Sequence, residues 1–269
     1  MENAWTVVTG ATGSMGAVAV RRMAAEGYPV VMACRNLEKG EQLRTRILTE
    51  QKDAVLELME LDLASRASVR SFVEALGGRP IAALFNNAGV LSRRYVKTED
   101  GIEQTFAVNY LNTSLLTRLL VPFMVDGGNV VNMVSLTCKL SRLDMGWQEL
   151  GEREFSQIGT YGKTKLALLY FSIELARRNP QLHVNVSDPG IVNSNMISMD
   201  RWFDPLADIF FRPFIKSPEK GAEPALRALH CNDSLRYFVG RRSGMIPARF
   251  LKSKMPDSLW NQANELLGM

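Results

Sequence analysis

The chain has 269 residues, 46% of them hydrophobic, and a formal net charge of +4. This length and apolar content suit one large α/β domain with a buried core. Basic residues are dispersed among acidic ones, no apolar run approaches the roughly 20 residues of a membrane span, and the few cysteines and histidines lack metal-ligand spacing. We therefore expect a cytoplasmic protein with no nucleic-acid partner, no transmembrane span and no metal site.

Short, nearly continuous apolar runs are typical of parallel strands that are buried on both faces. They cover Trp5–Thr9, Pro29–Cys34, Val55–Met59, Ile81–Phe85, Val130–Val134 and Leu182–Ser187. Segments with helical periodicity alternate with them, at Met15–Glu26, Leu37–Gln51, Ser65–Leu76, Glu99–Val125 and Gln157–Arg178. This alternation predicts a single-domain α/β Rossmann fold over residues 1–269, a doubly wound parallel sheet with helices on both faces and ligands at the carboxyl ends of its strands.

The first predicted strand leads directly into the glycine-rich turn Thr9-Gly-Ala-Thr-Gly-Ser-Met-Gly16, which opens a helix. Glycines at these positions allow a sharp turn and a close backbone approach to a pyrophosphate, while the helix N-terminus favours the anion. An ordinary strand-to-helix turn would also use glycine, but the place between a buried strand and an amphipathic helix favours a dinucleotide. The expected contacts are Gly10, Thr12, Gly13, Ser14, Met15 and Gly16.

The residues at the end of the second predicted strand, Ala33-Cys-Arg-Asn36, bear on the choice of dinucleotide. An NAD site places a carboxylate here for the ribose 2′-hydroxyl, whereas an arginine accommodates a 2′-phosphate. No carboxylate is present, and Arg35 offers a planar fork of donors, with Asn36 beside it. The sequence therefore favours NADP(H) over NAD(H); the alternative interpretation of Arg35 is a solvated side chain at a strand end.

Tyr161 and Lys165 are spaced to lie on one face of a predicted helix. A phenol, with a pKa of about 10, is a poor acid–base catalyst at neutral pH unless a cation such as the Lys165 ammonium stabilises the phenolate. This pair alone is common by chance. Ser135 strengthens it, because it follows a strand at the sheet edge where its hydroxyl can hydrogen-bond a substrate oxygen. Asn86-Asn-Ala-Gly89 predicts a second turn at the same edge.

Together these motifs resemble those of the short-chain dehydrogenase/reductase family. The resemblance extends from the first strand to the last helix and rests on Thr9–Gly16, Asp62-Leu63, Asn86–Gly89, Asn109, Ser135, Tyr161 with Lys165, and Pro189-Gly190. Within that family the chain is most similar to the retinol-dehydrogenase-like branch, through Ala33–Asn36, Phe106–Leu111, the long spacing between Ser135 and Tyr161, and the tail Leu259–Leu267.

The resemblance implies a role for each matching residue. Ser135 and Tyr161 would polarise a carbonyl oxygen, and Lys165 would also bind the nicotinamide ribose. Asn109 would hold a water in the proton relay behind Lys165. The adenine ring would contact Asp62, and Asn87 would shape the nucleotide pocket. The other implied cofactor contacts are Leu63, Ala88, Gly89, Pro189, Gly190, Val192 and Ser194.

Three features depart from the family's usual pattern. Gly13 stands one place early in the glycine turn and Ser14 occupies the position of the middle glycine, which resembles an epimerase-like spacing. The turn lacks the basic residue often found in NADP enzymes, so NADP rests mainly on Arg35. Asp188 stands where the close relatives usually have His, which changes the polarity expected beside the nicotinamide.

The segment from Met196 to Ile215 is rich in Met and aromatic residues and follows Pro189-Gly190. We expect a substrate lid around residues 193–217, which favours a small lipophilic alcohol or carbonyl substrate. Two alternatives are a segment that closes the core and a face that makes peripheral contact with a membrane. The long helices allow either a monomer or a homodimer.

The leading hypothesis is an NADP(H)-dependent oxidoreductase that interconverts an alcohol and a carbonyl by hydride transfer, with Tyr161 as the acid–base group. One alternative is a non-catalytic regulator that senses NADP(H), which would have no need of a phenol beside an ammonium. The other is an epimerase or dehydratase acting on a nucleotide sugar, which the glycine spacing suggests.

Overall fold

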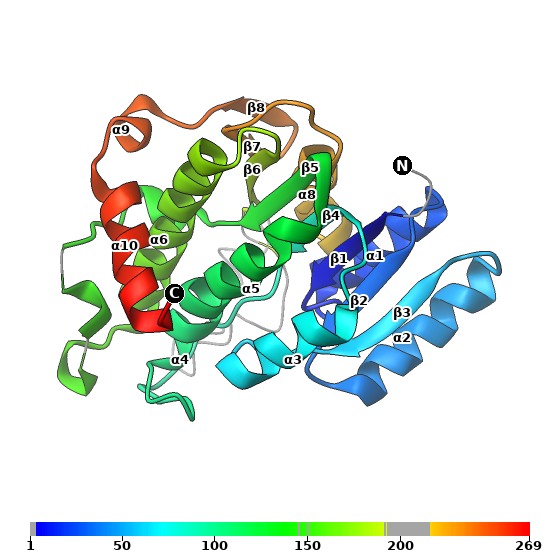
Figure 1. Ribbon diagram of the computed structural model, residues 1–269, viewed down its shortest axis with the longest axis horizontal. Helices are drawn as coiled ribbons and strands as arrows, with labels where there is room; N and C mark the ends of the chain where they lie inside the picture. Colours follow the sequence, from blue (N-terminus) through cyan, green and yellow to red (C-terminus); the bar gives the residue numbers. More distant parts are fainter. Residues whose placement is uncertain (1–3, 145, 150, 191, 193–215) are drawn as a thin grey trace.

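One eight-stranded sheet forms the centre of the protein (Figure 1). The computed structural model describes residues 4–144, 146–149, 151–190, 192 and 216–269. The strand order is β3-β2-β1-β4-β5-β6-β7-β8, and every neighbouring pair is parallel except β7 with β8. The strands are β1 Trp5–Thr9, β2 Val30–Cys34, β3 Leu56–Glu60, β4 Ile81–Asn86, β5 Met124–Met133, β6 His183–Asp188, β7 Arg236–Val239 and β8 Arg242–Met245.

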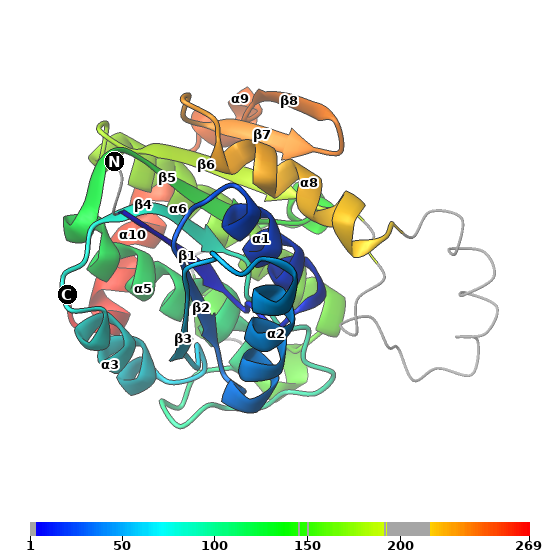
Figure 2. The same cartoon turned by 90° about the vertical axis from the view of Figure 1, so that its right-hand side faces the viewer.

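Helices cover both faces of this sheet (Figure 2). One face carries α1 Ser14–Ala25, α2 Leu37–Glu50 and α8 Pro218–Leu229. The other carries α3 Arg66–Leu76, α5 Asn112–Leu120, α6 Gln157–Arg178 and α10 Met255–Leu267. Shorter helical turns complete the described chain, at α4 Gln104–Phe106, η1 Ala107–Leu111, η2 Val121–Phe123, η3 Leu136–Lys139, η4 Trp147–Glu149, η5 Glu152–Glu154 and α9 Ala248–Leu251. The doubly wound sheet that the sequence predicts is therefore confirmed.

Alternation along the strands divides the apolar residues between two cores. Val7 and Val130 lie in the core against α3, α5 and α6, whereas their chain neighbours Val8 and Val131 lie in the core against α1, α2 and α8. All four side chains have no exposed surface. Successive side chains of a strand point to opposite faces, so a continuous apolar run fits a strand covered on both sides.

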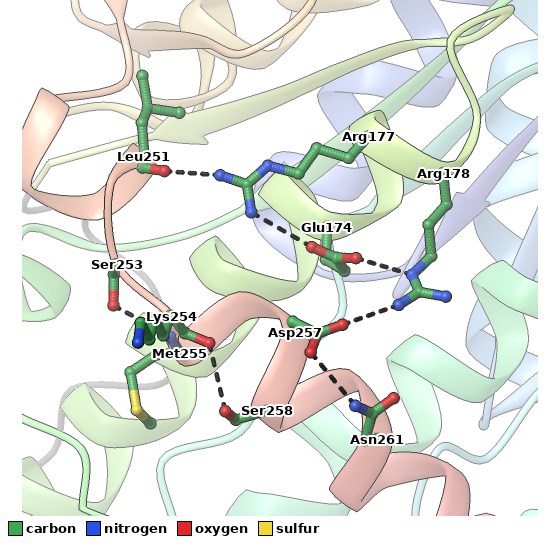
Figure 3. A network of polar contacts seen from close by, with 10 residues as sticks. All are labelled: Glu174, Arg177, Arg178, Leu251, Ser253, Lys254, Met255, Asp257, Ser258 and Asn261. Atoms are coloured by element: carbon green, nitrogen blue, oxygen red, sulfur yellow. Dashed lines mark hydrogen bonds and ion pairs between the residues drawn. The ribbon is translucent and has the colours of Figure 1, made fainter.

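The C-terminal helix α10 is fastened to α6 by a network of charges (Figure 3). Glu174 of α6 is nearly buried and accepts hydrogen bonds from Arg177 and Arg178, at 3.4 and 2.8 Å. Arg178 also reaches Asp257 of α10 at 3.0 Å. The guanidinium of Arg118 in α5 lies 3.7 Å from the ring centroid of Trp260 in α10. The tail is thus an integral part of the α6 side of the core.

The predicted strands and helices agree with the structure to within one residue at each end, with two exceptions. The helix predicted at Glu99–Val125 begins only at Gln104, because Gly101, with φ of 77°, closes a turn and the Glu103 carboxylate caps the amides of Thr105 and Phe106. It ends at Leu120 and gives way to a 3-10 turn at Pro122.

The fifth strand was predicted at Val130–Val134 and in fact begins at Met124. Its first residues include Gly127 and Gly128, which depress the strand signal, and its pairing with β4 shifts register there. The antiparallel hairpin of β7 and β8 was not predicted. Its turn contains Gly240, with φ of 52°, followed by Arg241, a hairpin signal that the sequence does carry.

Two further expectations concern the substrate lid and a transmembrane span. Of the lid predicted around residues 193–217, only Lys216 and Ser217 are among the described residues, and the predicted cofactor contact Ser194 lies outside them. Of the helices in the described ranges, none combines the length and the apolar character that crossing a bilayer requires.

Candidate active site

The glycine turn after β1 forms an open cradle at the N-terminus of α1. Gly10 adopts φ of 62°, a left-handed conformation that favours glycine. Gly13 is the N-cap of α1, no side chain caps this helix, and its first turn holds no acidic residue. A Cβ at Gly16 would collide with the Gly10 carbonyl oxygen and stand 2.8 Å from Asn87 Nδ2. The first amides of α1 are therefore available to an anion.

The turns after β1 and β4 are bonded to each other. The Asn87 side-chain amide donates to the carbonyl oxygens of Thr9 and Gly10, at 2.9 and 3.1 Å. In return the Thr9 hydroxyl oxygen accepts the backbone amides of Asn87 and Ala88, at 3.1 and 3.0 Å. The predicted pocket residue Asn87 is thus in place beside the glycine cradle, where it fixes the shape of the turn.

The predicted adenosine-side residues follow β2 and β3 at the same edge of the sheet. Arg35 is exposed and forms no ion pair with any residue in the described part of the chain. Asn36 caps α2 by accepting the Lys39 amide at 2.8 Å. Asp62 is half-buried, and its carboxylate accepts the Ala64 amide at 2.9 Å. The side chains of Asn36 and Asp62 therefore also stabilise the turns in which they lie.

Tyr161 lies in the second turn of α6, beside Ser135 at the end of β5. Ser156 caps α6 by accepting the Gly159 amide. Gly162 lets the helix approach η3 and the residues after it, because a Cβ there would collide with the Ser141 hydroxyl and stand 3.5 Å from Thr137 Cβ. Burial raises the pKa of Tyr161 to about 12, although a hydrogen bond with the Ser135 side chain opposes the rise. The structure therefore brings Tyr161 and Ser135 together, as the sequence predicts.

Lys165 is buried beneath Tyr161, with only 2% of its surface exposed. Its ammonium lies 5.7 Å from the Tyr161 ring centroid and donates a 2.8 Å hydrogen bond to the Met133 carbonyl oxygen. Burial lowers the pKa of Lys165 to about 8. Asp188 and Cys138 also raise the pKa of Tyr161. That Lys165 lowers this pKa stays a prediction.

Asn109 lies in a π-helical turn, which interrupts the regular hydrogen bonding of the helix. Its side chain accepts the Val90 amide at 2.8 Å and donates to the Val90 carbonyl oxygen at 2.9 Å. It also reaches the Thr164 hydroxyl at 3.3 Å. The carboxamide therefore ties the turn after β4 to α6, and a water-holding role for Asn109 stays a prediction. Thr164 carried no sequence signal for this contact.

Gly89 fits closely between Asn109 and Lys165. A Cβ at this position would stand 3.3 Å from Asn109 Oδ1 and 3.4 Å from Lys165 Nζ. The glycine of the second turn therefore lets the backbone approach the Lys165 ammonium.

The turn after β6 closes the site on the β7 side. Gly190 adopts φ of 73° and donates its amide to Asp188 at 2.9 Å, while the Lys216 ammonium donates to the Pro189 carbonyl oxygen at 3.1 Å. Val192 is buried and pairs with Lys216 in an isolated bridge. Val192 and Met15, two predicted cofactor contacts far apart in sequence, both approach the Cα of Gly221 in α8.

Comparison with known proteins shows the family of this site. A family model described as short chain dehydrogenase matches residues 4–202. The chain belongs to the short-chain dehydrogenase family. The family is one of oxidoreductases, and among the described residues of this member no group of His, Cys, Asp or Glu side chains is arranged to hold a metal ion.

Curated short-chain dehydrogenases resemble this chain over most of its length. Retinol dehydrogenase 12 of Mus musculus is 33% identical over 273 residues, which cover 98% of this chain and 86% of the mouse protein. Retinol dehydrogenase 14 of Homo sapiens is 30% identical and covers 100% and 88% of the two chains. Polyprenol dehydrogenase of Mus musculus is 35% identical over 80% of this chain and 68% of its own. The resemblance to the retinol-dehydrogenase-like branch is therefore confirmed.

Solved structures of other proteins share the fold. A short-chain dehydrogenase from Sphingobium yanoikuyae in complex with NADPH has a TM-score of 0.67 at 21% identity, over 98% of this chain and 95% of its own. An uncharacterized protein from Mycobacterium Paratuberculosis has a TM-score of 0.80 at 28% identity, over 99% and 94% of the two chains. These similarities confirm the Rossmann-type architecture.

Proposed function

We propose that this short-chain dehydrogenase is an NADP(H)-dependent oxidoreductase that interconverts a lipophilic alcohol and its carbonyl, with Tyr161 as the acid–base group. The observation that carries the proposal is the convergence of Ser135, Tyr161 and Lys165. They lie at the carboxyl edge of the sheet, the same edge that bears the uncapped N-terminus of α1. Open parallel sheets bind their ligands at this edge.

The residues of the cradle fit a dinucleotide. The uncapped amides after Gly13 suit a pyrophosphate, and the absence of a Cβ at Gly10 and Gly16 leaves the turn in the shape that brings those amides together. Bound NADP(H) would supply or accept the hydride. Further contacts are assigned to Asp62 on the adenine side and to the turn at Pro189-Gly190 on the nicotinamide side.

Preference for NADP(H) rests on Arg35. This side chain is exposed directly after β2, and the residues Ala33 to Asn36 include no carboxylate that would repel a 2′-phosphate. A guanidinium binds phosphate through paired, charge-assisted hydrogen bonds. The NADPH complex of the Sphingobium protein, which has the same fold, is consistent with this choice.

The proton chemistry is assigned to the chain's own side chains. Ser135 would hold the carbonyl oxygen by a hydrogen bond, and Tyr161 would give that oxygen its hydroxyl proton as the alcohol forms. Lys165 is held in position by Met133, and its positive charge favours the phenolate that remains. In the reverse direction the phenolate of Tyr161 accepts the alcohol proton.

A lipophilic substrate is supported by the relatives and by the surface beside the site. The relatives are named for retinol and polyprenol, which are long apolar alcohols. In this chain Leu136, directly after Ser135, is 54% exposed, and Leu140 is 82% exposed. Large apolar side chains exposed next to Ser135 in the chain are consistent with an apolar ligand.

The test follows NADPH absorbance with a panel of aliphatic, aromatic and retinoid-like aldehydes and ketones. Wild type is expected to turn over the lipophilic members, and Tyr161→Phe is expected to lose at least about a hundredfold in kcat/KM. Tyr170→Phe is the matched control, since Tyr170 lies on the same helix against Phe250. Equal activity of wild type and Tyr161→Phe, or inertness of both across the panel, would overturn the proposal.

A further inference from the structure

The β7–β8 hairpin lies at the end of the sheet (Figure 1), and together with η3 it borders a cavity, named here the hairpin cavity. The volume of this cavity is about 270 Å³. Its walls include Lys139, Tyr237, Val239, Arg242, Gly244 and Met245. None of these residues belongs to the candidate active site, so the hairpin cavity is a separate feature of the surface.

The register of the hairpin explains why it is hollow here. Tyr237 is paired with Gly244, and Val239 is paired with Arg242. Residues that are directly paired across two antiparallel strands, and residues two apart on one strand, lie on the same face of the sheet, so these four positions face the cavity together. Gly244 has no side chain, and a Cβ there would meet nothing within 4 Å. The space beside Tyr237 is therefore left open.

Both charged side chains in the walls of the hairpin cavity are basic. Lys139 comes from η3 and Arg242 comes from β8. Neither forms an ion pair with any residue in the described part of the chain. Asp188 does not line the cavity, because its carboxylate is buried and accepts the Tyr237 hydroxyl at 2.8 Å. Two cations without a carboxylate beside them favour an anionic occupant.

The cations are arranged in a way that suits a carboxylate. Arg249 of α9 donates a 3.1 Å hydrogen bond to the Lys139 carbonyl oxygen, and the Lys139 ammonium lies 4.1 Å from the ring centroid of Tyr237. Contacts that hold a side chain in place reduce the entropy that is lost when a ligand binds. Arg242 offers a planar fork of donors that matches the two oxygens of a carboxylate.

The other walls of the hairpin cavity favour an apolar body on the same ligand. Val239 lines it from β7, and the Met245 side chain, which is 54% exposed, lines it from β8. Methionine adapts its shape readily to apolar ligands. A cavity of this volume holds a ligand of about ten non-hydrogen atoms, fewer than a drug-sized molecule has.

We propose that the hairpin cavity is a binding site for a small carboxylate with an apolar body, such as a medium-chain fatty acid. Its carboxylate is bound by Lys139 and Arg242, and its chain lies against Val239 and Met245. The occupant contacts η3, which begins directly after Ser135. The inference does not depend on the proposed oxidoreductase function, because it uses none of the residues assigned to that function.

The first test is a titration with octanoate, followed by NMR of protein with isotope-labelled methionine methyl groups. The Met245 signal is assigned by its absence in Met245→Leu, and the Met15 signal, from the predicted nucleotide site, is assigned in the same way. We expect the Met245 signal to shift with a Kd of about 1 mM and the Met15 signal to stay in place. Octanol, which lacks the charge, is expected to bind at least about tenfold more weakly. An unmoved Met245 signal, a shift of Met15 alone, or equal affinity for octanol would each refute the proposal.

The second test removes one cation from the hairpin cavity. Arg242→Gln is expected to weaken octanoate binding at least about fivefold. Arg241→Gln is the matched control, because Arg241 is the neighbouring exposed arginine and does not line the cavity, so its affinity should equal that of wild type. Charged residues on an edge strand also discourage pairing with further strands. If that were their only role, the two variants would bind octanoate alike, and such a result contradicts a carboxylate site.

The third test fills the hairpin cavity. Gly244→Leu places a side chain in the open space beside Tyr237 and is expected to abolish the octanoate-dependent shift of the Met245 signal, while thermal unfolding checks that the variant is folded. Unchanged binding would place the ligand elsewhere and end the argument.

A membrane is the other source of an anionic group on an apolar body. Wild type and Arg242→Gln are therefore sedimented with vesicles of phosphatidylserine and phosphatidylcholine. No binding that depends on Arg242 is expected. Vesicle binding that is lost in Arg242→Gln, without any response of wild type to octanoate, would assign this surface to a membrane and overturn the proposal.

Discussion

The Lys165 ammonium is bonded to the Met133 carbonyl oxygen at the end of β5, two residues before Ser135. A buried cation is thus held by a backbone dipole rather than by a carboxylate. This arrangement leaves the positive charge available to Tyr161, 5.7 Å from its ring, and it costs stability because the ammonium is removed from water.

Lys165→Met is therefore expected to reduce activity without reducing stability. We expect a loss of about 10² to 10⁴ in kcat/KM for NADPH-dependent reduction, and a Tm equal to or above that of wild type. The pKa of Lys165 in the folded protein, about 8, is below its ordinary value of 10.5, because the ammonium is buried. The unfolded chain therefore binds more protons between these values, and this lysine makes wild-type stability rise with pH across that window.

Thermal unfolding at a series of pH values measures this effect. The variant should lack the rise that Lys165 contributes. Lys163→Met, on the same helix, is the control and should keep both the rise and the activity. A Tm for Lys165→Met several degrees below wild type would show that the ammonium stabilises the fold.

Arg35→Ala is expected to separate the two dinucleotides. Loss of a charge-assisted pair of hydrogen bonds to the 2′-phosphate should weaken NADPH binding about 10- to 100-fold, while NADH, which lacks that phosphate, changes little. Fluorescence titration of both nucleotides measures the ratio. Equal losses for the two would remove the argument for NADP(H).

Gly16→Ala is expected to damage the glycine cradle. The added methyl group would meet the Gly10 carbonyl oxygen and Asn87 Nδ2, so the turn must shift. We expect at least about tenfold weaker NADPH binding and a loss of about 1–3 kcal/mol in the free energy of unfolding. Gly244→Ala is the control, because a Cβ there would meet nothing within 4 Å. Unchanged nucleotide affinity in Gly16→Ala would place the pyrophosphate elsewhere.

Arg118→Ala is expected to loosen the C-terminal helix. Arg118 donates to Asn264 Oδ1 at 2.5 Å and to the Trp260 carbonyl oxygen at 3.3 Å, and its guanidinium lies over the Trp260 ring. The variant should lose about 2–4 kcal/mol in urea unfolding. Arg22→Ala, which breaks an exposed pair with Glu26, should change stability by less than about 0.5 kcal/mol. Similar values for the two variants would contradict a buried anchoring role.

The hydrophobic periodicity of the segments, together with the alternation of strand-like and helix-like segments along the chain, predicted most of the fold. Continuous apolar runs such as Val30–Cys34 signal strands covered on both faces, and the structure has them there. The helix predicted from Glu99 begins only at Gln104, because the Glu103 side chain caps the helix there. The helical periodicity of the surrounding residues does not reveal this cap. The β7–β8 hairpin was missed because its strands are only four residues long and β8 is fully exposed.

The candidate site was also predicted only in part. Ser135, Tyr161 and Lys165 were predicted because each follows from strand-end position or helical spacing. The electrostatic environment was not predictable, since Asp188, Cys138 and Tyr237 come from three separate elements and meet only in the folded protein. Their influence depends on burial, which a single sequence does not display.

The two carboxamides of Asn87 and Asn109 form a mechanical coupling across the site. Asn87 fastens the glycine turn to the turn after β4, and Asn109 fastens that second turn, through Val90, to Thr164 on the helix of Tyr161. The glycine turn and the helix that bears Tyr161 are thereby linked by side chains as well as by the sheet. A displacement of the glycine turn should therefore also displace Tyr161. We expect nucleotide affinity and the rate of the acid–base step to fall together when the side-chain amide of Asn87 or Asn109 is removed.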